Sequence, residues 1–150
     1  MTSNRYPQIN LGCGIYPEAG FVNVDVDPSV HPDIVRDVTR GLPFGDASVA
    51  LVRAHHFLEH LDPDDFLFVI SECWRVLVPG GLLDVLVPLG ITDDPTHRIF
   101  FHENSFNVFL DPNAQAYYRR GTTWSCHSRS VVAQKFPGLH IVLCKQPPSA

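Results

Sequence analysis

The segment Gln8–Asp27, with the sequence QINLGCGIYPEAGFVNVDVD, contains the pattern that decides the fold of this chain. Its first part, Gln8–Leu11, is a short β-type run that stops at Gly12-Cys13-Gly14. A second β-type run, Phe21–Val26, ends among acidic residues. In an open parallel α/β sheet, ligands bind at the carboxyl ends of the strands. The segment therefore predicts a ligand site where these two strands end.

The connection between the two strands is unusually short, because only Ile15–Gly20 joins them. Parallel neighbours usually need a crossover of about a dozen residues or more. Six extended residues nevertheless reach roughly 20 Å, which is enough to return along a short strand. An antiparallel pair is the alternative. We favour a bare loop between parallel strands, because it places the acids of the second strand beside the glycines of the first.

Further strands and one clear helix follow. Asp33–Val38 and Ser48–Ala54 read as the third and fourth strands. A helix is predicted from an N-cap at Asp62, with apolar residues at helical spacing, to a stop at Pro79-Gly80-Gly81. The apolar run Leu82–Val87 then predicts a strand buried on both faces.

The last third of the chain has a weaker pattern. It predicts two short helices and a terminal hairpin: Glu103–Leu110, Ala114–Arg120, and the strands Ser130–Phe136 and Leu139–Lys145 around Pro137-Gly138.

The fold class expected from these elements is α/β. Apolar strands with helices between them favour a doubly wound, Rossmann-like and mostly parallel twisted sheet. The terminal hairpin makes its last part antiparallel, and the helices are few and short. With 150 residues, 45% of them hydrophobic and 18% charged, residues 1–150 are expected to form a single compact domain.

Charge and cysteine usage exclude several function classes. The net charge of −5 argues against a nucleic-acid partner, which would require a basic excess. No apolar run approaches the length of a membrane span, and the N-terminus lacks the apolar core of a secretory signal. The cysteines at 13, 73, 126 and 144 are far apart and form no CxxC, so we expect neither a disulfide framework nor a cysteine zinc site. These features suit a cytoplasmic protein.

The glycines and acids of the first strands predict an adenosine ligand. Gly12 and Gly14 would let the backbone approach it closely. Asp25 would accept hydrogen bonds from ribose hydroxyls, and Asp37 from an adenine amino group. The dinucleotide pattern GxGxxG fails at Pro17, and no helix follows to bind a pyrophosphate. A turn at the glycines and solvated or capping roles for the acids are the structural alternatives.

Five segments, in this order, resemble class I S-adenosylmethionine-dependent methyltransferases, especially small and partly phage-borne ones. They are Ile9–Gly14 (INLGCG), Asn23–Asp25 (NVD), Leu42–Phe44 (LPF), His56–Leu61 (HFLEHL) and Arg75–Gly81 (RVLVPGG). The resemblance covers about residues 8–90.

The resemblance implies S-adenosylmethionine as cofactor and a set of binding residues. Gly12, Cys13 and Gly14 would lie under the methionine part, and Asp25 or Asp27 would bind the ribose. Asp37 and Val38 would lie near the adenine, and His55–Leu58 would form the floor near the methyl group.

Methyl transfer from a sulfonium mainly requires alignment of donor and acceptor. His56 is the expected base where the acceptor must lose a proton, and His97 is the second catalytic candidate. His97 lies with Asp94, Thr96 and Arg98 on the expected acceptor side, and Tyr117 and Tyr118 would supply an aromatic wall. The fourth strand is followed by Ala54-His55-His56-Phe57, not by the [DNS]-P-P-[YFW] segment of amino-methylating DNA enzymes. The acceptor is therefore expected to be a small molecule or a protein, and a homodimer that covers the thin site is a further expectation.

Two other functions remain open at this stage. One is a non-catalytic adenosyl-ligand binding module or partner subunit. The other is a zinc hydrolase, because His56, Glu59 and His60 match the H-x-x-E-H pattern. No third ligand is evident at a helical setting, so no metal is expected, and the segment also reads as plain core structure.

Overall fold

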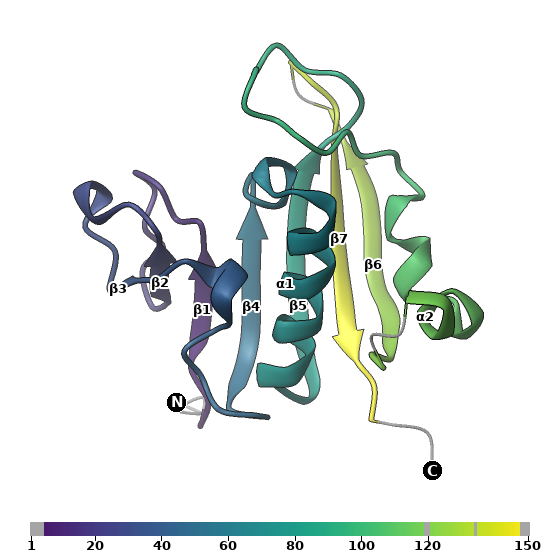
Figure 1. Cartoon of the computed structure of the whole chain (residues 1–150), viewed down its shortest axis with the longest axis horizontal. Helices are drawn as coiled ribbons and strands as arrows, with labels where there is room; N and C mark the ends of the chain where they lie inside the picture. The colour runs from purple at the N-terminus through teal and green to yellow at the C-terminus, as the bar shows by residue number, and fades with distance from the viewer. Residues whose placement is uncertain (1–4, 119–120, 134, 148–150) are drawn as a thin grey trace.

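The computed structural model describes residues 5–118, 121–133 and 135–147. Within these residues, seven strands form one sheet in the order β3-β2-β1-β4-β5-β7-β6 (Figure 1). Strands β1 to β5 run parallel, and β7 is antiparallel to both β5 and β6. Their bounds are β1 Gln8–Leu11, β2 Val22–Asp25, β3 Ile34–Val35, β4 Val49–His55, β5 Leu77–Pro88, β6 Trp124–Val132 and β7 Gly138–Lys145. The predicted mostly parallel sheet with a C-terminal hairpin is confirmed.

Strands β1 and β2 are joined by a bare loop, as predicted. They pair in parallel, with Leu11 opposite Val24. The buried side chain of Asn23 takes the place of a crossover helix in organising this loop. Its Oδ1 accepts from Asn10 Nδ2 at 3.0 Å and from the Glu18 N–H at 2.8 Å, while its Nδ2 donates to Asp33 at 3.0 Å. One polar side chain thus ties the loop to β1 and to the chain before β3.

Replacing Asn23 with alanine is expected to lower the free energy of unfolding by about 2–3 kcal/mol, because the buried Asn10 side chain and the part-buried groups of Glu18 and Asp33 lose their hydrogen bonds. Urea denaturation monitored by circular dichroism measures this loss. Asn113→Ala, at an exposed position of a short helix, is the control and should change stability by less than about 0.5 kcal/mol. A loss for Asn23→Ala no larger than the control's would contradict this account of the loop.

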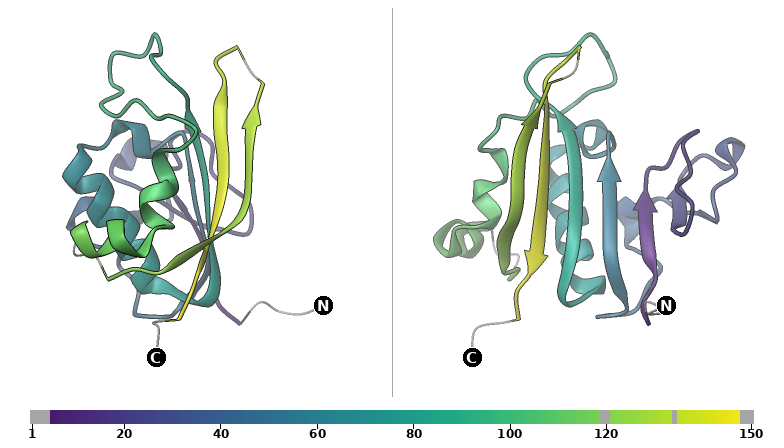
Figure 2. Two further views of the ribbon diagram at one scale, coloured as in Figure 1. Left: turned by 90° about the vertical axis from the view of Figure 1, so that its right-hand side faces the viewer. Right: turned by 180° about the vertical axis from the view of Figure 1, so that it is seen from behind.

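The helices lie on one face of the sheet (Figure 2). Helix α1 (Pro63–Val76) buries Phe66, Val69, Ile70, Cys73 and Val76 against it. On the opposite face, Leu82, Asp84 and Leu86 of β5 are only partly buried, whereas the alternate residues of the strand are fully buried. The expectations of a doubly wound sheet and of a strand buried on both faces are therefore wrong. The connections before β4 are too short to carry a covering helix.

The ends of α1 also differ from the prediction. Asp62 occupies the N-cap position, but its carboxylate makes no capping hydrogen bond. It accepts instead from the Arg98 side chain at 2.6 Å. The helix ends at Val76, and the extended conformation of Leu77 starts β5 before Pro79-Gly80-Gly81 is reached. That segment lies within β5, where the pairing with β4 is irregular, and does not act as the helix stop.

The region before β6 contains the 3-10 helix η4 (Ser105–Phe109) and the short helix α2 (Pro112–Tyr118). Both short helices were predicted. Arg119 and Arg120 of the second prediction, and Gln134 of the predicted hairpin strand, lie outside the described residues. Aromatic rings of Phe66, Phe101, Phe106 and Phe109 pack together between α1 and η4. No helix in the described part of the chain is long and apolar enough to cross a membrane.

Candidate functional site

The carboxyl ends of β1, β2 and β4 meet at one edge of the sheet. The chain moves outward from β1 to β3 and then returns to β4 on the other side of β1. Such a switch point is where open α/β sheets bind ligands. Two cavities open here, of about 360 and 560 Å³, and both are lined by Gly12 and His56.

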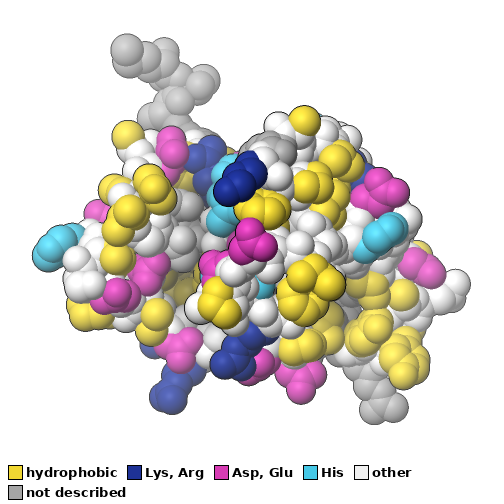
Figure 3. Space-filling view, turned by 90° about the horizontal axis from the view of Figure 1, so that it is seen from above, with side chains coloured by type: hydrophobic (Ala, Val, Ile, Leu, Met, Phe, Trp, Pro, Cys, Tyr) yellow, Lys and Arg dark blue, Asp and Glu magenta, His cyan; other side chains and the backbone are white. Residues whose placement is uncertain are grey.

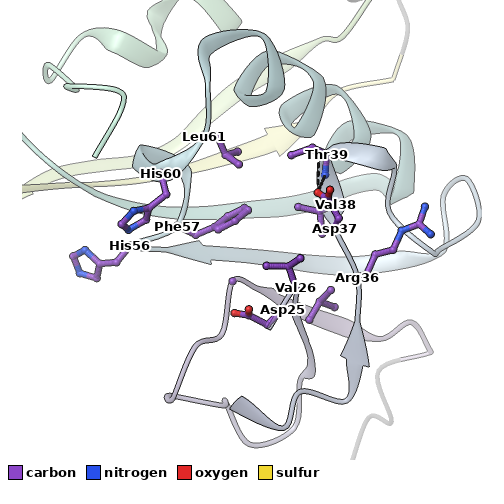
Figure 4. A pocket seen from close by; sticks show the side chains of 12 residues that line it. Asp25, Val26, Arg36, Asp37, Val38, Thr39, His56, Phe57, His60 and Leu61 are labelled. Atoms are coloured by element: carbon purple, nitrogen blue, oxygen red, sulfur yellow. Dashed lines mark hydrogen bonds between the residues drawn. The ribbon is translucent and has the colours of Figure 1, made fainter. Parts of the chain in front are cut away.

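The first cavity contains most of the predicted adenosine-binding residues (Figure 4). Asp25 lies at the end of β2. Its Oδ2 accepts from the Gly14 N–H and its Oδ1 from the Asp27 N–H, both at 2.9 Å. A carboxylate has about four lone-pair positions, so Asp25 keeps capacity to accept from a ligand. These two bonds fix the position of the Asp25 carboxylate and tie the glycine turn to β2.

Asp27 is placed differently. Its carboxylate accepts from the Ser29 N–H at 2.8 Å and caps the 3-10 helix η1 (Pro28–Val30). The hydrogen bonds of Ser29 lower the pKa of Asp27. Asp27 is not among the residues that line the first cavity, whereas Asp25 is.

Asp37 and Val38 both reach the first cavity from the turn after β3. Asp37 Oδ1 accepts from the Thr39 hydroxyl at 2.6 Å and from the Thr39 N–H at 3.1 Å. The hydroxyl bond lowers the pKa of Asp37 against the opposing effect of burial. Val38 is largely buried and adds an apolar wall.

The second cavity lies over Gly12, Cys13 and Gly14 and carries paired charges. Arg53 Nη1 lies 2.8 Å from Glu18 Oε2, so a cation and an anion stand side by side near the glycine turn. His55 also lines this cavity, from the end of β4. It therefore lies on the glycine side of the site and not in the first cavity.

On the uncovered face of the sheet, Asp84 lies between two histidines. Its Oδ1 is 2.7 Å from His140 Nε2, a hydrogen bond, and 3.1 Å from His55 Nε2. Burial raises the pKa of Asp84, but the two histidines outweigh it and lower this pKa to about 2. Arg53 Nε lies 3.5 Å from the other oxygen. The aspartate is thus held as an anion by three neighbours.

This depressed pKa predicts an acid-sensitive contribution to stability. The pKa of Asp84 is about 2 in the fold against an ordinary value of 3.8. The group therefore stabilises the fold fully above about pH 4, and the contribution is lost as the pH falls toward 2. It amounts to about 2 kcal/mol. Urea denaturation between pH 5 and pH 2 should show that the free energy of unfolding falls less with pH for Asp84→Asn than for the original chain. The same pH dependence in both proteins would contradict the depressed pKa of Asp84.

His56 lies where the cavities meet. It lines the first two and a third cavity of about 590 Å³, and its side chain is half-exposed. Its backbone has φ +53°, which is strained for a residue with a side chain. Burial lowers the pKa of His56, and the nearby His55, His97 and His60 lower it further. A neutral imidazole at this junction is suited to accept a proton.

The third cavity brings together residues that are distant in sequence. Glu59, His60 and His97 all line it. The Glu59 side chain is 1% exposed, and burial raises its pKa to about 7. His97 is 10% exposed and its Nδ1 lies 2.6 Å from the Thr92 hydroxyl. The predicted catalytic residue His97 is therefore part of a cluster with the buried Glu59 and the exposed His60. Figure 3 looks down on this end of the molecule and shows histidines gathered near its centre, between acidic and basic side chains.

The other residues of the expected acceptor side have mixed positions. Asp94 lines the third cavity. The Thr96 hydroxyl is hydrogen-bonded to His60 Nδ1, and Arg98 forms an ion pair with Asp62. Tyr117 and Tyr118 pack on each other in α2, beside η4, and line none of the three cavities. The expected aromatic wall is therefore wrong, because α2 lies across β6 from the site (Figure 1).

Several lining residues are absent from the sequence prediction: Glu18, Val26, Arg36, Thr39, Arg53 and Leu61. Val26 had a recognisable sign, since it is an apolar residue between two acids at a strand end and is exposed in the structure. Arg53 carries no such sign, because only the fold brings it to the glycine turn. Phe57 belongs to the segment His55–Leu58 that was expected at the floor of the site, and it lines the first cavity.

Comparisons with known proteins agree with this geometry. A family model described as a methyltransferase domain matches residues 17–85. Over these residues the chain is similar to methyltransferase domains, as its sequence motifs imply. The match starts just after the Gly12–Gly14 turn and ends within β5. No curated protein sequence matches the chain.

Several solved structures share the fold of this chain. A SAM-dependent methyltransferase from Methanosarcina mazei is 16% identical, with TM-score 0.69, over 95% of this chain and 94% of that one. One from Archaeoglobus fulgidus is also 16% identical, with TM-score 0.69, over 95% and 87%. The 1,6-didemethyltoxoflavin-N1-methyltransferase of Burkholderia thailandensis, solved with 1,6-didemethyltoxoflavin and S-adenosylhomocysteine, is 14% identical, with TM-score 0.64, over 95% and 72%. At these identities the likeness shows the fold. Together with the family match it confirms the expected enzyme class and its cofactor, S-adenosylmethionine, at the level of the family.

Proposed function

We propose that this chain is a methyltransferase that holds S-adenosylmethionine across the first and second cavities and methylates a small molecule or a protein side chain in the third. We further propose that residues 1–150 act as a single domain. The observation that carries the proposal is the position of Asp25, which is fixed by two backbone N–H groups beside the glycine turn that both cavities share.

The first cavity suits the adenosine part of the cofactor. Asp25 is the acceptor for the ribose hydroxyls, because it faces the cavity and Asp27 does not. Val26 and Val38 supply apolar surface for the adenine ring, and Asp37 lies on the same wall to accept from its amino group. Apolar walls with a few oriented polar groups are typical of nucleoside sites.

The second cavity suits the methionine part. Free amino acids carry a carboxylate and an ammonium group, and Arg53 and Glu18 present the complementary charges 2.8 Å apart. The ion pair would open to receive them. The backbone of Gly12–Gly14 would lie under the methionine chain, where the absence of side chains at both glycines allows close approach.

His56 is proposed as the base, since it borders all three cavities. In the transfer, the bond between sulfur and the methyl carbon breaks, and its electron pair stays on sulfur. The acceptor atom forms the new bond to the methyl carbon and releases its proton to the neutral imidazole of His56. The protein contributes mainly by aligning donor and acceptor and excluding water.

Calorimetric titration tests the proposal with three ligands: S-adenosylmethionine, S-adenosylhomocysteine and methylthioadenosine, which lacks the amino acid part. We expect micromolar binding of the first two and weaker binding of the third, because it leaves the second cavity unfilled. Equal affinity for all three would contradict the assignment of the second cavity. Binding without methyl transfer to any hydroxyl, amine or thiol acceptor would favour a non-catalytic binding module. Absence of binding in a folded sample would overturn the proposal.

A further inference from the structure

We propose that Glu59, His60 and His97 bind a divalent metal ion, zinc in the first instance, at the boundary between the cofactor site and the third cavity. Glu59 and His60 belong to the 3-10 helix η3 (Leu58–His60), and His97 lies in the loop that follows β5. One carboxylate oxygen and two imidazole nitrogens lie within 4.8 Å of one another. No metal was expected from the sequence, because His97 is separated from the other two residues by the whole of α1 and β5.

The contacts of Glu59 point to a cation. Its Oε1 lies 3.9 Å from His60 Nε2 and 4.0 Å from His97 Nε2, and these distances are too long for hydrogen bonds. Its Oε2 is buried and has no hydrogen-bond partner among the described residues. A buried carboxylate without partners is costly. Ligand atoms held about 2.0–2.1 Å from one zinc ion are separated by roughly 3–4 Å, so small side-chain rotations would bring all three into contact with it.

The hydrogen bonds of His60 determine which of its nitrogens is free. The Thr96 hydroxyl donates to Asp94 Oδ1 at 2.6 Å, so its oxygen accepts from His60 Nδ1 at 3.0 Å. His60 Nδ1 therefore carries the proton in the neutral ring, and the lone pair of Nε2 faces the Glu59 carboxylate. A lone pair and a carboxylate oxygen repel each other unless a proton or a cation lies between them.

His97 has the support that a metal-binding histidine requires. Its Nδ1 lies 2.6 Å from the Thr92 hydroxyl, and its Nε2 lies between two carboxylates, 3.4 Å from Asp94 Oδ2 and 4.0 Å from Glu59 Oε1. An outer hydrogen bond to the second ring nitrogen is the usual arrangement of metal-ligating histidines. Two imidazoles and one carboxylate form a ligand set found in catalytic zinc sites, where a fourth position stays open. The three residues line one cavity, so that position is accessible to a ligand.

A second cluster, His55, Asp84 and His140, has similar composition but different geometry. There the His140 Nε2 donates directly to Asp84 at 2.7 Å, and His55 lies 3.1 Å from the same oxygen. Its carboxylate already has close partners. The contrast identifies Glu59 as the carboxylate that needs a cation and provides a matched control within the same chain.

If the proposed function holds, the metal narrows the acceptor class to hydroxyl compounds. A hydroxyl oxygen bound at the open position would have a lowered pKa. Its proton would pass to the imidazole of His56, which borders the same cavity. The oxygen would then form its bond to the methyl carbon as the carbon–sulfur bond breaks, leaving S-adenosylhomocysteine and a methyl ether.

Metal content and zinc titration of the tag-free chain test this proposal. After treatment with a chelator, the original chain is expected to bind about one zinc ion per molecule by calorimetry and to melt at a higher temperature when zinc is added. Glu59→Gln and His97→Ala should weaken zinc binding by about 100-fold or more, and His60→Ala, at the most exposed ligand, should do the same without disturbing the core. His140→Ala is the control and should bind zinc like the original chain.

The possible outcomes separate this proposal from the proposed function. Zinc affinity that is unchanged in all three ligand variants, or absent from the original chain, would overturn the metal site. Titration with S-adenosylmethionine in the same samples reports the cofactor site independently. Cofactor binding without zinc binding would overturn only the metal site, whereas zinc binding without cofactor binding would overturn only the proposed function and the hydroxyl acceptor that depends on it.

Discussion

Replacing Asp25 with alanine is expected to weaken the binding of S-adenosylmethionine by roughly 5- to 150-fold, equivalent to about 1–3 kcal/mol. The carboxylate would accept from the ribose hydroxyls, and a charged acceptor makes stronger hydrogen bonds than a neutral one. The substitution also removes the partner of the Gly14 N–H, which Asp25 accepts at 2.9 Å. Calorimetric titration of the purified variant measures the change in affinity directly.

Two further variants separate the causes. Asp25→Asn keeps the size of the side chain and one acceptor oxygen but removes the charge, so an intermediate loss is expected. Asp27→Ala should leave the affinity within about twofold, because Asp27 caps its own turn outside the first cavity. Unchanged affinity for Asp25→Ala, together with a loss for Asp27→Ala, would move the ribose role to Asp27. Unchanged affinity for both would contradict the proposed cofactor site.

The strands near the site were predictable because their ends are marked by residue types with clear physical roles. The glycine turn ends β1, and the acids end β2 and the run that contains β3. The bare loop between β1 and β2 was also predictable, since the reach of six residues leaves few arrangements. The stabilisation of that loop was not predictable, because the hydrogen bonds of Asn23 join segments that are not adjacent in sequence.

The prediction that helices cover both faces of the sheet was wrong because of the composition of β5. Leu82–Val87 is nearly all apolar, and such runs usually indicate burial on both faces. Here Leu82 and Leu86 remain partly exposed on the face without helices. The connections before β4 are too short to contain helices, and this already argued against a second helical layer. Their length was a better guide to the covering of the sheet than the composition of β5.

The candidate site was predictable only where its residues follow strand ends. Two acids separated by one residue left Asp25 and Asp27 undecided in the sequence, and only the fold shows that Asp25, and not Asp27, lines the first cavity. The relation of His97 to Glu59 depends on how the loop after β5 returns to η3, where the Arg98 N–H donates to the Glu59 carbonyl at 2.7 Å. Spacing along the chain contains no information on such a contact.

Replacing Gly12 with alanine is expected to have the largest effect of any single change at the site. Gly12 has φ +60°, and a Cβ added there would lie 2.6 Å from Phe57 Cγ and 2.9 Å from Phe57 Cβ. Phe57 cannot relieve the overlap by ring rotation alone, because its own Cβ is too close. Overpacking and backbone strain together should lower the free energy of unfolding by roughly 2–4 kcal/mol. Displacement of Phe57, which lines the first cavity, should also abolish measurable cofactor binding.

Gly14→Ala is the matched control for this prediction. Gly14 has a similar φ of +51°, but a Cβ there would meet no atom within 4 Å. It should therefore lose only about 1 kcal/mol of stability from backbone strain. The double variant Gly12→Ala/Phe57→Ala should recover part of the stability lost in Gly12→Ala, because it removes the overlapping ring. Equal losses for Gly12→Ala and Gly14→Ala in urea denaturation would show that backbone strain, and not the packing of Phe57, makes glycine necessary at the end of β1.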